Sequence, residues 1–265
     1  MPSDTKKYNA FLAAWTKDAE PPSPELLSAW TKLLKDHSVP ASDIAKEAVI
    51  PIAKRHEASN PLGPECIDIW RLLVDTVEKM TEQNDRLVEF VVELQKLPDC
   101  DQGFHDLPQL AQYLSESSFD YIDDGRNRAK RQAWANINRF TAKLGALGLP
   151  PTPKQGPNVE LGGIVLRTTL EKPWTSTAIK ALNGWVPAAE QWIKYCGNII
   201  YKSQGDMESE WPSMWKGKKG WSRERWSFWK QRFFWITTLR PLTERTREIA
   251  KECADEMTRI EESRS

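Results

Sequence analysis

Residues 211–235 read WPSMWKGKKGWSRERWSFWKQRFFW. This stretch contains six of the thirteen tryptophans in the chain, three phenylalanines and seven Lys or Arg residues. Glycine and lysine are frequent in its first part, so residues 205–220 are predicted to form a polar, mobile loop. Ser222 is then expected to cap a long aromatic helix that Pro241 ends.

The apolar side chains of this helix fall on two neighbouring faces. Spacings of three and four residues place one set on a common face: Trp226, Trp229, Phe233 and Ile236. A second set recurs every seven residues, with Arg225 and Arg232 close by: Trp221, Phe228 and Trp235. A helix that is apolar over so much of its circumference is expected to be buried on more than one side. We therefore expect this helix at the centre of the C-terminal half.

The rest of the chain repeats the helical period between prolines. Apolar residues at helical spacing form stripes such as Cys66, Ile69, Trp70, Leu73, Val77 and Met80. Helices are also expected over 41–57 with a kink at Pro51, over 119–147, over 160–171, over 174–183 and from Pro187 onward. No stretch alternates apolar and polar residues convincingly. The sequence thus predicts an all-α fold, a multi-helix bundle of about ten helices in two packed lobes with no significant sheet.

Four prolines between residues 147 and 160 mark the expected boundary between the lobes. The N-terminal lobe, 1–149, carries 18 Lys or Arg against 23 Asp or Glu and is acidic. The Trp-rich C-terminal lobe, 150–265, carries 19 against 14 and is basic. Opposite charges favour attraction between the lobes, so we expect one continuous globular unit.

Composition and motif content indicate the cellular compartment of the protein and exclude some classes of partner. The net charge is zero, and no recognised nucleic-acid-binding motif is present, so nucleic acid is not an expected partner. The four cysteines are scattered without a CxxC pair, which is typical of a reducing compartment. No apolar run approaches a membrane span, and the N-terminus lacks the apolar core of a signal peptide. These features predict a cytoplasmic protein that is not inserted in a membrane.

Catalytic and metal-binding signatures are weak. The histidines His37, His56 and His105 are isolated, and the sequence contains no GxSxG, P-loop or dinucleotide fingerprint, so no metal or cofactor is expected. One carboxylate cluster, Asp120, Asp123 and Asp124, would share a helix face and suit magnesium-dependent diphosphate chemistry. Its DxxDD order differs from the DDxxD of prenyl-chain enzymes, and acidic residues near a helix start are favoured by the helix dipole alone.

A possible ion pair stands out on the helix over 160–171. Arg167 and Glu171 are four residues apart, so their side chains can meet. If the pair is exposed, it contributes little to stability. If it is buried, its desolvation is costly and a functional role becomes the better interpretation. Of the two, we favour a structural ion pair.

Several separated motifs together resemble a known family. In chain order they are Trp134-x-Asn136-x-Asn138-x-Phe140-x-Ala142-x-Leu144, Arg167-Thr168-Thr169-Leu170-Glu171, Pro187-Ala188-Ala189 with Trp192-Ile193 and Gly197, Trp226-x-Phe228-Trp229-x-x-Arg232-Phe233, and Ala254-x-x-Met257-x-x-Ile260-Glu261. Over residues 130–262 this succession is similar to the fungal domain-of-unknown-function family numbered thirty-six thirty-two. The resemblance implies a fungal, all-helical, intracellular protein and carries no activity.

The resemblance also directs attention to polar residues inside apolar motifs. Together with two tryptophans they form the predicted ligand-binding set: Asn138, Arg167, Glu171, Trp192, Trp229 and Arg232. The first hypothesis is that these residues bind a small, partly apolar molecule in a Trp-lined pocket between the lobes, with catalysis in fungal metabolism left open. The alternative is a non-enzymatic protein-interaction module that uses its helical surface or the Lys216–Lys219 loop. A closed concavity favours the first hypothesis, whereas an exposed apolar patch favours the second.

Overall fold

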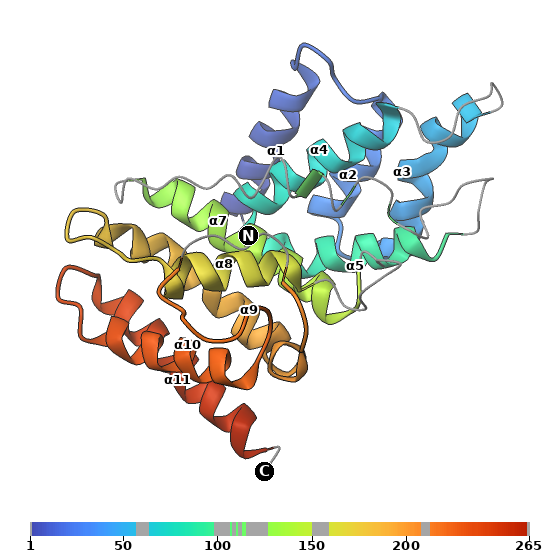
Figure 1. Ribbon diagram of the computed structural model, residues 1–265. Helices are drawn as coiled ribbons and strands as arrows, with labels where there is room; N and C mark the ends of the chain where they lie inside the picture. The colour runs from blue at the N-terminus through green and yellow to red at the C-terminus, as the bar shows by residue number, and fades with distance from the viewer. Residues whose placement is uncertain are drawn as a thin grey trace. The chain divides into compact units, whose positions relative to one another are not determined.

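The computed structural model describes residues 2–56, 64–97, 107, 110, 113–114, 127–149, 159–207 and 213–263. These residues form ten α-helices, two 3₁₀ turns and one isolated β-bridge, between Gly205 and Trp221 (Figure 1). The predicted all-α fold is therefore confirmed. The chain divides into two compact units, Met1–Leu114 and Ser115–Ser265. The proline-rich segment 150–158 lies outside the described residues, and the expected boundary there stays a prediction, although helices on both sides of it belong to the second unit.

The first unit is a set of five described helices. They are α1 (Pro2–Thr16), α2 (Pro24–Lys35), α3 (Ala41–His56), α4 (Pro64–Lys79) and, after the 3₁₀ turn η1 (Thr81–Gln83), α5 (Asn84–Gln95). α3 packs against both α2 and α5, and it continues past Pro51 as one helix. The fully buried Trp30 of α2 lies at the centre, in edge-to-face contact with Phe90 at 5.2 Å between ring centroids. Its indole N–H donates to the buried hydroxyl of Thr76 at 2.8 Å.

The second unit is built around α9 rather than around the aromatic helix. Its elements are α7 (Arg128–Ala146), α8 (Glu160–Glu171), the 3₁₀ turn η3 (Ile179–Ala181), α9 (Leu182–Lys202), α10 (Arg223–Thr237) and α11 (Glu244–Glu262). α9 packs against α7, α8 and α11, whereas the aromatic helix α10 packs mainly on α11 and α8 (Figure 1). The expected central position of α10 was wrong, because α9 is the helix whose several faces are buried.

Small residues explain why α9 can hold three neighbours. A Cβ atom on Gly162 of α8 would lie 2.4 Å from the Trp192 ring of α9, and one on Gly197 of α9 would lie 2.7 Å from Ile260 of α11. Real Cβ atoms do not approach other atoms so closely, so these glycines are what allow the helices to pack at short range. The core around α9 is accordingly dense with large side chains from its neighbours.

The start of α9 differs from the prediction. No helix covers 174–183; instead a loop leads into η3, and α9 begins at Leu182, five residues before Pro187. Pro187 is the sixth residue of the helix, where its missing N–H removes a single helical hydrogen bond. The proline was therefore a poor marker of the helix start.

Two further sequence features have clear outcomes. Ser222 does cap α10, since its hydroxyl oxygen accepts a hydrogen bond from the Arg225 backbone N–H at 3.1 Å. None of the helices in the described part of the chain has the length and apolar character that crossing a bilayer requires.

The Trp30–Thr76 contact gives a test of the first unit. Replacing Thr76→Val keeps the shape of the side chain but leaves a buried indole N–H without an acceptor, so the free energy of unfolding should fall by about 1–3 kcal/mol. The measurement is urea denaturation of the variant. In a Trp30→Phe background the same replacement should cost much less, because the donor is gone. Equal costs in the two backgrounds would show that the hydrogen bond contributes nothing specific.

Candidate functional site

A buried carboxylate lies at the end of α8. The side chain of Glu171 is fully buried. Arg225 of α10 donates two hydrogen bonds to it, from Nε to Oε1 at 2.6 Å and from Nη2 to Oε2 at 2.8 Å. The indole N–H of Trp229 donates to Oε1 at 2.7 Å. A bidentate, charge-assisted pair of this kind offsets part of the cost of taking a carboxylate out of water.

The helical spacing of α10 creates the two donors. Arg225 and Trp229 are four residues apart, so both side chains leave α10 on the same face, toward α8. Ser222 fixes where the helix begins and therefore sets this register. Arg167, one turn earlier on α8, is also buried, with its Nε 3.8 Å from Oε2 of Glu171. The predicted Arg167–Glu171 ion pair therefore forms and is buried. Arg225, however, lies closer to the Glu171 carboxylate than Arg167 does.

Arg225 and the backbone of Glu171 also hold the segment that precedes α10 in place. Arg225 donates from Nη1 to the carbonyl of Gly220 at 3.0 Å, and the Met214 N–H donates to the backbone carbonyl of Glu171 at 2.8 Å. The Trp221 N–H donates to the Gly205 carbonyl at 2.8 Å. The mobile loop expected over 205–220 is therefore anchored at several described points, while residues 208–212 lie outside the described part of the chain.

Asn138 and Trp192 form a second buried pair. The Trp192 indole donates to Asn138 Oδ1 at 2.7 Å, and Asn138 Nδ2 donates to the Trp134 carbonyl one turn earlier at 2.9 Å. Both side chains are fully buried. The pair therefore locks α9 onto α7 through a satisfied polar contact.

Arg232 contacts both the C-terminal end of α8 and a tryptophan ring. Its Nε donates to the Leu170 carbonyl at 2.9 Å, and its guanidinium stacks on the Trp235 ring at 3.8 Å from the centroid. The last carbonyls of a helix have no partner within it, so Arg232 supplies a donor and a positive charge to the C-terminal end of α8. Partial burial lowers the pKa of Arg232 from its usual value.

Next to the contacts of Glu171 and Arg232 lies a group of half-buried side chains that we call the aromatic strip. We define it as Trp215, Phe228, Arg232 and Trp235. The last three lie on one face of α10, and Trp215 reaches that face from the preceding segment, 5.5 Å from Phe228 between ring centroids. All four side chains are half-buried, whereas Phe234 and Met214 nearby in the sequence have exposed fractions of 45% and 40%.

Exposed lysines lie in the turn that carries Trp215. Lys216 and Lys218 are exposed, and Glu224 is the only acidic residue between 213 and 240. Arg223 is also exposed, but its guanidinium lies over the Tyr201 ring of α9 at 5.3 Å from the centroid. The Trp215 indole donates to the Lys218 carbonyl at 2.8 Å, which folds the lysine-bearing turn back beside the ring. Aromatic rings and cations are thus held close together on one surface.

The described contacts join the six predicted residues in separate groups. Arg167, Glu171 and Trp229 come together, Arg232 is adjacent through Leu170, and Asn138 with Trp192 forms its own pair. Whether this set binds a ligand stays a prediction. Sequence reasoning missed Arg225 as the main partner of Glu171, because the two residues are 54 positions apart in the chain.

Other candidate chemistry has little support. Asp120, Asp123 and Asp124 lie outside the described residues, and within the described ones no three His, Cys, Asp or Glu side chains gather as a metal site would require. Cys196 and Cys253 are free and buried, and burial raises the pKa of the Cys196 thiol to about 12. A thiol with so high a pKa is a poor nucleophile, because the thiolate is the reactive form.

The chain is thus a helical-bundle protein in which the buried polar side chains described above contact one another or the backbone. The family model described as "Protein of unknown function (DUF3632)" matches residues 70–233, more than half of the chain, and the protein belongs to this family. The match begins in α4 of the first unit, earlier than the resemblance in the sequence suggested, and ends within α10. No curated protein and no solved structure matches the chain.

Gly220 provides a test of the anchored segment. It has φ +80, and a Cβ atom there would lie 1.9 Å from the Gly205 carbonyl oxygen. Gly148 is the matched control, with φ +75 and no atom within 4 Å of the added Cβ. Both alanine variants should lose about 1–2 kcal/mol to left-handed strain, and Gly220→Ala should lose at least about 1 kcal/mol more to the clash. Equal losses in thermal or urea unfolding would contradict the anchoring.

Proposed function

We propose that this protein is a non-enzymatic protein-binding module, in which the aromatic strip binds an acidic segment of a partner protein. The observation that carries the proposal is the strip itself, in which half-buried rings on α10 and the Trp215 ring of the preceding segment lie beside exposed lysines. Aromatic residues and arginine are enriched at protein interfaces and supply most of their binding energy.

The strip is held in position before any partner arrives. Trp215 is fixed by its bond to the Lys218 carbonyl, and the segment that carries it is fixed to Glu171 through Met214. Arg232 is fixed between Leu170 and the Trp235 ring. A surface whose side chains are already ordered loses less entropy on binding, which favours affinity.

The charges favour an acidic peptide over nucleic acid. Of the cations on α10, Arg225 is paired with Glu171, and Lys230 is paired with Glu261 of α11. α11, which packs on α10, itself carries several acidic side chains, including Glu248, Glu252 and Glu256. Strong binding to nucleic acid draws on many phosphate contacts, about six to ten in well-studied cases. A short acidic segment needs only the few cations at the edge of the strip.

A small-molecule function for the predicted set has less support. The indole N–H groups of Trp192 and Trp229 already donate to Asn138 and Glu171. A ligand at either place would have to break a buried hydrogen bond before forming its own, which costs free energy. We place the protein in the cytoplasm, since the buried free thiols of Cys196 and Cys253 suit a reducing compartment.

The test uses defined peptides that alternate Glu with Leu or Phe, and matched peptides with Lys in place of Glu. The acidic peptides should bind the full chain, and their affinity should fall as salt is added. Trp215→Ala and the charge reversal Lys216→Glu with Lys218→Glu should each weaken binding about tenfold or more, measured by titration calorimetry.

A matched control separates the strip from net charge. Lys180→Glu with Lys202→Glu changes the charge equally at two exposed lysines that are not part of the strip. These variants should bind within about twofold of the unmodified chain. Equal binding of the acidic and basic peptides, or equal loss in both double variants, would overturn the proposal. Tighter binding of single-stranded RNA than of the acidic peptides would replace it with a nucleic-acid function.

A further inference from the structure

Two neighbouring backbone carbonyls near the end of α8 accept hydrogen bonds from side chains of other segments. The Trp174 indole N–H donates to the Thr169 carbonyl at 2.9 Å, and Nε of Arg232 donates to the next carbonyl, that of Leu170, at 2.9 Å. Residue 173 is a proline without an N–H, so the Thr169 carbonyl has no helical donor and is left for the indole. Successive residues of a helix are only about 1.5 Å apart along its axis, so Trp174 and Arg232 reach the same helix end. Because Arg232 belongs to the aromatic strip, Trp174 lies close to the strip.

A lysine lies over the Trp174 ring. Nζ of Lys172 is 4.7 Å from the ring centroid, and Lys172 is exposed whereas Trp174 is half-buried. Arg232 makes the same kind of contact with the Trp235 ring. A cation held against the face of an indole is attracted by its π-electrons. Lys172 and Trp174 therefore repeat, beside the strip, the combination of ring and cation that the strip already contains.

The loop after α8 adds a positive charge and no acidic side chain. Between α8 and η3 the only charged side chain is that of Lys172, and the next acidic residue after Glu171 is Glu190 of α9. Glu171 itself is buried and paired with Arg225, so its charge is compensated inside the second unit. Lys172 is thus placed to meet a negative group on a partner, as the exposed lysines beside Trp215 are.

We propose that Lys172 and Trp174 extend the binding surface of the aromatic strip, so that the partner segment carries two acidic groups with apolar residues between them. One acidic group meets the lysines beside Trp215, and the other meets Lys172. The inference rests on the function proposed above and adds to it the pattern of the partner segment. Rings supply the apolar contact, and cations at two places fix how the segment lies. When one acidic group is bound, the second contact is intramolecular, which raises the affinity.

The test compares two series of peptides that have equal net charge. In the two-ended series a pair of Glu residues stands on each side of a spacer that contains Leu and Phe, and the spacer is made in several lengths. In the one-ended series all the Glu residues stand on one side of the same spacers. At the spacer length that fits, the two-ended peptide should bind the full chain about fivefold tighter or more than its one-ended counterpart, measured by titration calorimetry.

Charge variants identify which lysine reads the second acidic group. Lys172→Glu should remove the preference for the two-ended peptide, because it replaces an attraction by a repulsion at an exposed position. Lys251→Glu makes the same change at an exposed lysine of α11 and should keep the preference. Carbodiimide coupling joins a peptide carboxyl group to a lysine amine as an amide, with loss of water. Mass spectrometry of the coupled complex should find the amide at Lys172 and not at Lys251.

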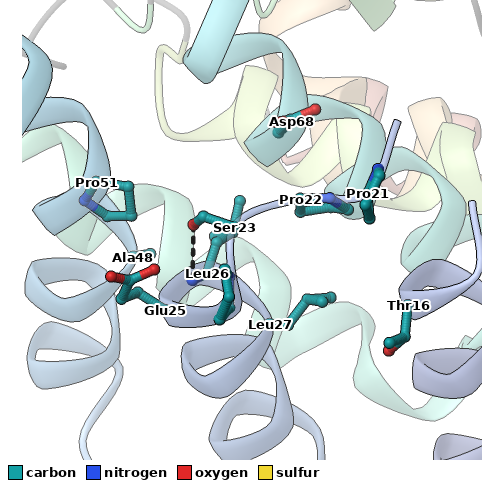
Figure 2. Close-up of a pocket in the computed structure, with 11 residues that line it drawn as sticks. Thr16, Pro21, Pro22, Ser23, Glu25, Leu26, Leu27, Ala48, Pro51 and Asp68 are labelled. Carbon is teal, nitrogen blue, oxygen red and sulfur yellow. Dashed lines mark hydrogen bonds between the residues drawn. The ribbon is translucent and has the colours of Figure 1, made fainter. Parts of the chain in front are cut away.

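A pocket in the first unit is a competing place for the apolar residues of such a peptide. Its volume is about 580 Å³, and Figure 2 shows Pro21, Pro22, Pro51 and Leu27 around it. Leu27→Trp places a larger side chain at a half-exposed position of this pocket. Because the peptide is expected on the second unit, this variant should bind both series within about twofold of the unmodified chain. Far-UV circular dichroism checks the fold of each variant.

The outcomes separate this inference from the proposed function. If Lys216→Glu with Lys218→Glu weakens the binding of both series, the proposed function stands. The inference is then overturned by equal binding of the two series at every spacer length, or by a preference that survives Lys172→Glu. If neither series binds, or if only Leu27→Trp weakens binding, the proposed function fails and the inference fails with it.

Discussion

A carboxylate that is buried away from water needs a positive charge and hydrogen-bond donors around it. Glu171 is such a carboxylate, so the second unit has to supply these groups. Leaving its charge uncompensated would cost several kcal/mol, about the size of a typical margin of stability. The pairing fixes the face of α10 that points toward α8, because Arg225 and Trp229 must both reach the same two oxygens. The orientation of α10 against α8, two helices that are distant in the sequence, thus depends on the partners of one carboxylate.

The surface of α10 follows from the same contact. With Trp226, Trp229, Phe233 and Ile236 directed into the core, the next face of the helix is left at the boundary with solvent. Phe228, Arg232 and Trp235 occupy that face, and Trp215 joins them because Arg225 and the Glu171 carbonyl hold its segment in place. The surface that we propose to bind a partner is therefore ordered, although Trp215 lies outside α10.

The sequence was a good guide wherever a local pattern decides the structure. Local patterns predicted the all-α fold and the cap at Ser222, because those features depend on residues a few positions apart. They also placed Arg167 beside Glu171. The pairing of Glu171 with Arg225 crosses 54 positions and no local pattern contains it. Periodicity could not show that Phe228 and Trp235 stay half-exposed, since a repeat of seven describes a face and not what covers it.

Hydrogen exchange of the backbone amides tests most directly whether the Glu171 carboxylate organises this region. The comparison is between the unmodified chain and Glu171→Gln, which keeps the size of the side chain and removes its charge. The account predicts faster exchange at the Met214 and Trp221 amides in the variant, with the core amides of α9 unchanged, because only the anchored segment loses its support. Unchanged exchange at Met214 and Trp221, or a uniform rise across the unit, would contradict it.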